Sequence, residues 1–164
     1  MSDEKSQLLD YYRLQRRHVL GIVDGLSADE LRRSVLPSGW SPIELLHHLA
    51  VDVEEFWFAR VMAGRPITAD DPITENAWHV EPSVPTQDVV ERYRRACDEA
   101  DSLIGSTSLD TPPGWWPDFF GDSRMEDLRE VILHCMVETA AHAGHLDVVR
   151  ELIDGRQWMV LEGD

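Results

Sequence analysis

VILHCMVETAAHAGHLDVV, residues 131–149, is the segment that decides the fold. It has the pattern of a helix that is apolar except along one stripe. Because helix residues four apart lie about 40° from each other and residues seven apart about 20°, Glu138, His142 and His145 point the same way, and His134 extends the stripe by one turn. Carboxylate and imidazole groups in apolar surroundings need partners, and a divalent metal is an economical one.

Three further long helical patterns accompany this segment, and no strand pattern is found. A capping box at Ser27–Glu30 predicts a short turn between the first two. The long helices are predicted from Lys5 to Gly25, from the Ser41-Pro42-Ile43-Glu44 cap to Ala63–Gly64, from Thr86 to Ile104, and from a capping box at Ser123–Glu126 to Asp154–Gly155.

The expected fold is an all-α four-helix bundle in one domain, residues 1–164. Residues 65–85 connect the second and third helices and contain four prolines without a helical period. Such a connection is long for a loop between adjacent antiparallel helices, so we expect a crossover or a functional loop, and not a simple up-down-up-down order.

Composition excludes several classes of partner. A net charge of −16 argues against nucleic acid and against an anionic membrane surface. No apolar run reaches membrane-spanning length, and the N-terminus has no signal-peptide pattern. Cys97 and Cys135 match no zinc or redox spacing, so we expect a reduced, cytoplasmic setting. Fourteen of the fifteen basic residues are arginine, which suggests a GC-rich bacterial source.

Glu138 and His142 would supply two metal ligands from one helix, and the third must come from elsewhere. His47 and His48 on the second long helix are the candidates, and helical phase leaves both open. Two imidazoles and one carboxylate leave an open coordination position, as in catalytic zinc sites. His145 would be a fourth ligand, a support for a ligand or a contact for the substrate. Without a metal, the same residues would be polar side chains on a solvated helix face.

Two segments carry a resemblance to a known family: LPSGWSPIELLHHLA, residues 36–50, and VETAAHAGH, residues 137–145. They resemble the uncharacterised actinobacterial branch of the DinB-like superfamily. The resemblance implies a four-helix bundle that holds a divalent metal through one His of the second helix and two residues of the fourth. The ligand position immediately precedes Leu-Ala, which selects His48. Many members have a His-x-x-x-His pair on the last helix, and this chain has Glu138 in place of the first His. The mycothiol-dependent maleylpyruvate isomerases, whose metal-binding domain is similar, also have the Glu-x-x-x-His arrangement. The resemblance therefore implies His48, Glu138 and His142 as the ligands.

The resemblance implies a metal-dependent S-transferase or isomerase that uses a small-molecule thiol, mycothiol in particular, against an electrophilic substrate. Zinc suits the ligands best, with nickel, manganese and iron as alternatives. Two other classes stay open: a metallohydrolase with metal-bound water as nucleophile, and a non-catalytic protein of the stress response that binds a metal or ligand. Pairing of helix faces into a homodimer is also plausible for such a bundle.

Further site candidates follow from position. His145 is the candidate general base. Trp115 and Trp116 would form the wall of a pocket for the thiol or substrate, or else cap the end of the bundle. Asp52 and Glu55 follow His48 by one and two turns and would orient it, or would be solvated surface charges. Phe56 and Trp57 are expected in the core.

Overall fold

A computed structural model of the protein describes residues 3–67 and 76–158. None of these residues forms a β-strand, which confirms the all-helical class. The long helices are α1 (Glu4–Val23), α3 (Pro42–His48) continuing directly into η1 (Leu49–Met62), α4 (Thr86–Ser106) and α5 (Leu128–Asp154). Short helices α2 (Ala28–Leu31) and η3 (Asp118–Phe120) lie in the connections.

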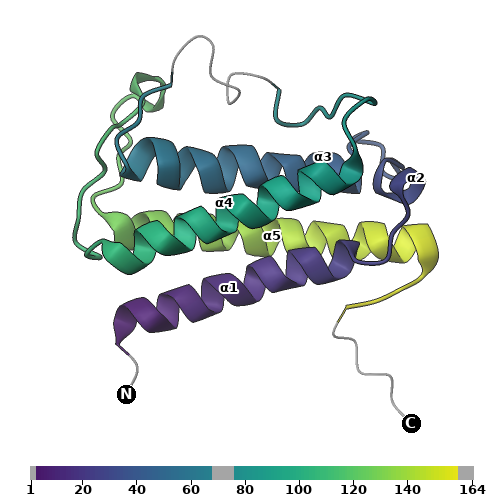
Figure 1. Cartoon of the computed structure of the whole chain (residues 1–164), viewed down its shortest axis with the longest axis horizontal. Helices are drawn as coiled ribbons and strands as arrows, with labels where there is room; N and C mark the ends of the chain where they lie inside the picture. Colours follow the sequence, from purple (N-terminus) through teal and green to yellow (C-terminus); the bar gives the residue numbers. More distant parts are fainter. Residues whose placement is uncertain (1–2, 68–75, 159–164) are drawn as a thin grey trace.

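The long helices lie side by side and enclose one apolar core (Figure 1). α1 packs mainly on α5, and the continuous α3–η1 helix packs on both α4 and α5. η1 ends and α4 begins at opposite ends of the molecule, so these two helices run in the same direction (Figure 1). The connection between them, of which residues 68–75 lie outside the described part, thus joins two parallel helices, in keeping with the expected departure from a simple up-down-up-down order.

The helix starts follow the predicted caps in two of three cases. Ser27 and Glu30 form the capping box of α2, and Ser41 and Glu44 form that of α3, with Glu44 Oε2 accepting from the Ser41 backbone N–H at 2.9 Å. Pro42 occupies the first turn of α3, where its missing N–H costs nothing.

The predicted start of α5 at the Ser123–Glu126 box is wrong. The helix begins at Leu128 with Asp127 as N-cap, whose carboxylate accepts from the Glu130 N–H at 3.0 Å. The preceding loop fixes this start, because the Leu128 N–H donates to the Thr111 carbonyl at 3.0 Å. An ionised carboxylate at the cap also interacts favourably with the positive end of the helix dipole.

From Leu49 onward the second helix changes from α to π hydrogen bonding. The Ala63 N–H, for example, donates to the Phe58 carbonyl five residues earlier at 3.0 Å. Long π-helical stretches are rare, and they often mark functional sites. The wider turn changes which side chains share a face after His48. Most of η1 is buried, including the charged Glu54.

A buried ion pair joins α1 to η1. The Arg16 guanidinium donates to both Glu54 oxygens, at 2.7 and 2.6 Å, and the Tyr12 hydroxyl donates to Glu54 at 2.8 Å. Both charged side chains are almost fully enclosed. Burial alone would lower the pKa of Arg16, but the adjacent Glu54 raises it well above its usual value. Arg16 is therefore charged, and it is held by two carboxylates, the buried Glu54 and the partly exposed Asp101.

Glu54→Gln should destabilise the fold by up to about 3–5 kcal/mol, because it leaves the buried Arg16 charge with only the partly exposed Asp101 as counter-charge. Chemical unfolding by urea, followed by circular dichroism, measures this. The matched control is Glu91→Gln, which breaks an exposed pair with Arg94 and should cost under about 1 kcal/mol. Equal losses in the two variants would contradict the role assigned to the buried pair.

Candidate functional site

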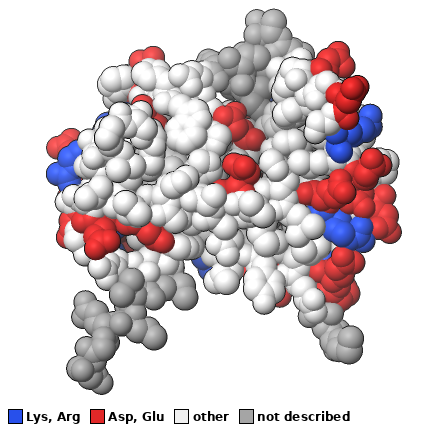
Figure 2. All heavy atoms as spheres, turned by 180° about the vertical axis from the view of Figure 1, so that it is seen from behind, with Lys and Arg blue, Asp and Glu red and all other residues white. Residues whose placement is uncertain are grey.

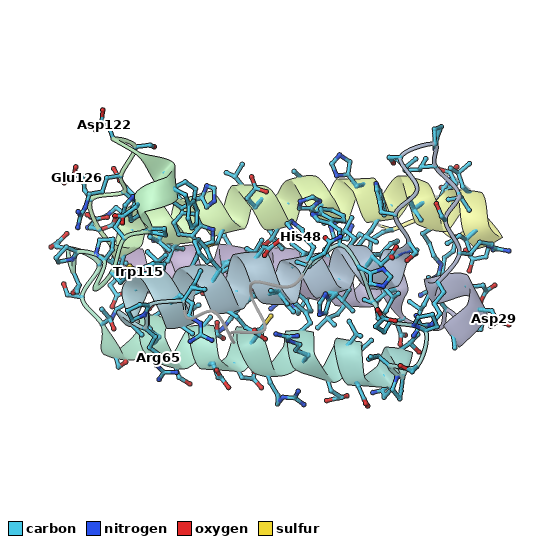
Figure 3. The ribbon with its side chains drawn as sticks, turned by 90° about the horizontal axis from the view of Figure 1, so that it is seen from above. Asp29, His48, Arg65, Trp115, Asp122 and Glu126 are labelled. Carbon is cyan, nitrogen blue, oxygen red and sulfur yellow. The ribbon has the colours of Figure 1, made fainter. Side chains whose placement is uncertain are left out.

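His48 stands at the junction of α3 and η1, near the middle of the continuous helix (Figure 3). Its Nδ1 lies 2.8 Å from Asp52 Oδ2, one turn later. An ionised Asp52 can only accept, so Nδ1 carries the proton and Nε2 keeps its lone pair in the neutral ring. The indole of Trp78 stacks on the imidazole, with ring centroids 4.2 Å apart and planes at 20°. His48 is thus fixed in both orientation and tautomer.

His142 on α5 faces His48 across the helix interface. The two ring centroids are 5.0 Å apart, at 75°. His142 Nε2 lies 3.7 Å from Glu138 Oε2, and His142 Nδ1 lies 3.4 Å from His145 Nδ1. The structure therefore brings together His48, Glu138 and His142, the three residues that the resemblance implied as ligands.

His47 faces away from this cluster. Its Nδ1 lies 2.9 Å from the Ala77 carbonyl, and its Nε2 lies 3.2 Å from Nη1 of Arg92 on α4. Of the two histidines that helical phase left open, only His48 reaches α5. His47 instead holds Ala77, and so helps to place the neighbouring Trp78 over His48.

Trp78 is the site residue that sequence reasoning missed. It lies in the connection before α4, where no periodicity predicts the direction of a side chain. Its ring contacts both histidines of the cluster, with centroids 4.2 Å from His48 and 5.8 Å from His142. A tryptophan in a long connection with no helical pattern was the only signal available.

Burial and nearby imidazole set the electrostatics of the cluster. Burial, followed by the proximity of His48, lowers the pKa of His142 from 6.5 to about 4. Burial also lowers the pKa of His134, one turn before Glu138. His142 is therefore neutral at pH 7 in the metal-free protein, and a neutral imidazole is the form that binds a metal or accepts a proton.

An apolar cavity of about 890 Å³ opens beside the cluster. His48, Asp52 and Glu138 line one part of it, and His134 lines it further along α5. The remaining walls are mostly aromatic and come from η1 and from the segment before α5: Phe56, Trp57, Trp115, Phe119 and Phe120. Phe56 and Trp57 are buried, as predicted, and also face the cavity.

The loop that carries Trp115 is fastened to the end of η1 (Figure 3). The Trp115 N–H donates to the Val61 carbonyl at 3.1 Å. Gly64 and Gly114 pass so closely that a Cβ on Gly114 would lie 2.9 Å from the Gly64 backbone, so neither position has room for a side chain. Trp115 consequently lines the cavity. Trp116 packs behind the cavity wall, with its ring 5.9 Å from Trp57.

The other candidates lie at the margin or elsewhere. His145 is exposed, and its contacts are with His142. Glu55 does not orient His48, because both of its oxygens accept from Arg92 at 2.7 Å. Asp52 is the carboxylate that orients His48.

No group of three or more His, Cys, Asp or Glu side chains within residues 3–67 and 76–158 is arranged to hold a metal ion as it stands. The donor types nevertheless fit a divalent metal. Two ligands on one tetrahedral ion lie about 3.4 Å apart, close to the 3.7 Å between Glu138 and His142. His48 keeps Nε2 available, and Glu138, with 43% of its side chain exposed, has room to turn.

These features define a helical protein with a histidine–carboxylate cluster beside an aromatic cavity. The family model described as mycothiol S-transferase matches residues 7–155. The chain therefore belongs to the mycothiol S-transferase family, which is DinB-like, and the resemblance noted in the sequence is confirmed. No curated protein and no solved structure matches the chain significantly. Within the described ranges, no helix is long and apolar enough to cross a membrane.

The low pKa of His142 predicts a pH dependence of stability in the metal-free protein. The unfolded chain binds a proton at His142 below pH 6.5, whereas the folded protein does so only below about 4. Stability that is present above pH 6.5 is therefore lost as the pH falls from 6.5 to about 4. Between pH 7 and 4.5, the free energy of unfolding of His142→Gln should therefore fall by about 1–2 kcal/mol less than that of the wild type.

Urea unfolding at the two pH values measures this difference. His79→Gln is the control, because His79 is exposed and pairs with Glu81 outside the cluster. If His142→Gln lost as much stability as the wild type between pH 7 and 4.5, the pKa of His142 would not be lowered by the fold.

Proposed function

We propose that this protein is a metal-dependent S-transferase that joins the sulfur of mycothiol to a small electrophile. The family match over residues 7–155 supports the reaction class. The observation that carries the proposal is the contact between His48 and His142, which come from different helices and meet beside an aromatic cavity. A DinB-like four-helix bundle in the cytoplasm is the proposed setting, in keeping with two buried free cysteines.

His48, Glu138 and His142 would hold the metal, with zinc as the first candidate and nickel, manganese and iron as alternatives. When bound, the metal would supply a Lewis acid that favours the thiolate form of a thiol at neutral pH. Asp52 prepares His48 for this role, because its hydrogen bond to Nδ1 leaves Nε2 as the donor atom. The lowered pKa of His142 keeps that ring available as a donor.

The other residues would bind the substrate and move its proton. The aromatic walls, with Trp115 and Trp57 among them, exclude water and hold the electrophile against the cluster. His145 reaches His142 from the solvent side. It is placed to accept the proton that the thiol loses and to pass it to bulk water. Trp116 would support the wall from behind rather than contact the ligand.

The first experiment combines metal analysis with a conjugation assay. Purified protein should contain close to one divalent metal per chain by mass spectrometry, and His142→Ala should lose it. Conjugation of mycothiol to 1-chloro-2,4-dinitrobenzene, followed by absorbance, should fall at least about 100-fold in His48→Ala and His142→Ala. His79→Ala is the matched histidine control and should keep both metal and activity.

Two results would overturn this proposal. One is the absence of metal even after addition of zinc, nickel, manganese and iron. The other is turnover of electrophiles or esters without any thiol, which would instead indicate hydrolysis by bound water.

Asp52→Asn should weaken metal binding by about 10- to 100-fold without removing a ligand, because the amide no longer fixes the tautomer of His48. Competition with a chromogenic chelator measures the affinity. Glu55→Gln is the control, because Glu55 pairs with Arg92 and not with His48. Unchanged affinity in Asp52→Asn would show that this hydrogen bond does not support the site.

A further inference from the structure

The charge of the cavity wall restricts the electrophile. Of thirteen lining residues, eight are apolar or aromatic, three are the carboxylates Asp52, Asp118 and Glu138, and two are imidazoles. Within the described ranges, no lysine or arginine lines the cavity. Even with a divalent metal bound at Glu138, three carboxylates leave the wall net negative, and no guanidinium or ammonium in it would pair with a substrate carboxylate.

Three arginines on neighbouring segments make contacts outside the cavity wall. Arg92 binds Glu55 through two nitrogens on the side of η1 that faces α4. Arg65 lines a different groove, between η1 and α4. Arg124 lies over the ring of Trp116, 6.0 Å from its centroid. Figure 2 shows the back face of the molecule with a mostly uncharged middle that includes acidic patches, while Lys and Arg lie toward its margins.

The aromatic part of the cavity is built for a flat apolar group. Phe56 and Phe119 stack with centroids 6.3 Å apart and planes at 29°, and Trp57 and Phe120 stack at 5.6 Å and 16°. Phe119 is 70% exposed despite its size, so it forms an open lip at which an aromatic ring can pack. The negatively polarised faces of such rings favour neutral aromatic ligands over anions.

We propose that the cavity selects an uncharged, aryl-bearing electrophile with a leaving group on carbon, and rejects carboxylate-bearing analogues; this rests on the S-transferase function proposed above. In the reaction a carbon–sulfur bond forms between the mycothiol sulfur and the substrate carbon. The bond from that carbon to the leaving group breaks, and the leaving group departs with the bonding electron pair. The thiol proton passes to solvent, so the products are a neutral thioether and, for a chloride substrate, chloride ion.

The test compares benzyl chloride with 4-(chloromethyl)benzoate, which differ only in the carboxylate. Each is incubated with mycothiol and metal-loaded enzyme, and the thioether is measured by mass spectrometry after subtraction of the uncatalysed rate. We expect kcat/KM for benzyl chloride to be at least about tenfold higher. A kcat/KM for 4-(chloromethyl)benzoate that equals or exceeds the value for benzyl chloride would overturn the proposal.

A pair of charge-reversal variants separates the cavity from the net charge of the protein. Asp118→Lys places a cation in the cavity wall and should reduce the preference at least about threefold. Asp122→Lys makes the same charge change on the same loop but outside the cavity, and should leave the preference unchanged. An equal effect of the two variants would mean that overall charge, and not the cavity, sets the selectivity.

A binding measurement without thiol keeps this inference separate from the proposed reaction. Benzyl alcohol and 4-(hydroxymethyl)benzoate are unreactive counterparts, and Trp57 and Trp115 in the cavity wall report binding through their fluorescence. Binding of the neutral compound alone supports the selection by charge, even if no electrophile is conjugated and the transferase proposal fails. Equal binding of both compounds overturns the selection, whatever the conjugation assay shows.

Discussion

The buried pair of Arg16 and Glu54 is the constraint on which the rest of the structure depends. The carboxylate of Glu54, enclosed in an apolar core, depends on Arg16 for its counter-charge, while Arg16 pairs with both Glu54 and Asp101. Their hydrogen bonds fix η1 against α1 in one rotation and one register. That rotation turns Asp52, Phe56 and Trp57, on either side of Glu54, toward the cavity. A charge pair in the core thus sets the wall of the site.

Helix ends and loops complete the site around this helix. The close passage of Gly64 and Gly114 fastens the tryptophan loop to the end of η1 and brings Trp115 to the cavity. On the other side, His47 binds the Ala77 carbonyl and places Trp78 on His48. The two adjacent histidines therefore have different roles. His48 belongs to the cluster, and His47 holds the loop that places Trp78 over His48.

The cluster combines features that suit a metal with a cavity that suits an aromatic substrate. Neutral imidazoles and a half-exposed carboxylate are good donors for a divalent ion. The aromatic walls beside them reduce the access of water to one side of the site, while Glu138 and Phe119 remain exposed on the other. The three carboxylates of the wall exceed the charge that one divalent ion would bring, which supports the proposed selection against anionic substrates.

The sequence alone predicted the four long helices and the capping boxes of α2 and α3, because helical periodicity and capping act over three to seven residues. The family, and the expectation that His48, Glu138 and His142 are ligands, came from the resemblance of two segments. The sequence missed the start of α5 and the π-helical turns of η1, which depend on contacts with distant segments. Only the tertiary structure showed that Asp52 and not Glu55 orients His48, and that Trp115 and not Trp116 lines the cavity. It also revealed the role of Trp78. Those assignments depend on which neighbour each side chain meets across a helix interface, and spacing along one helix carries no information about that neighbour.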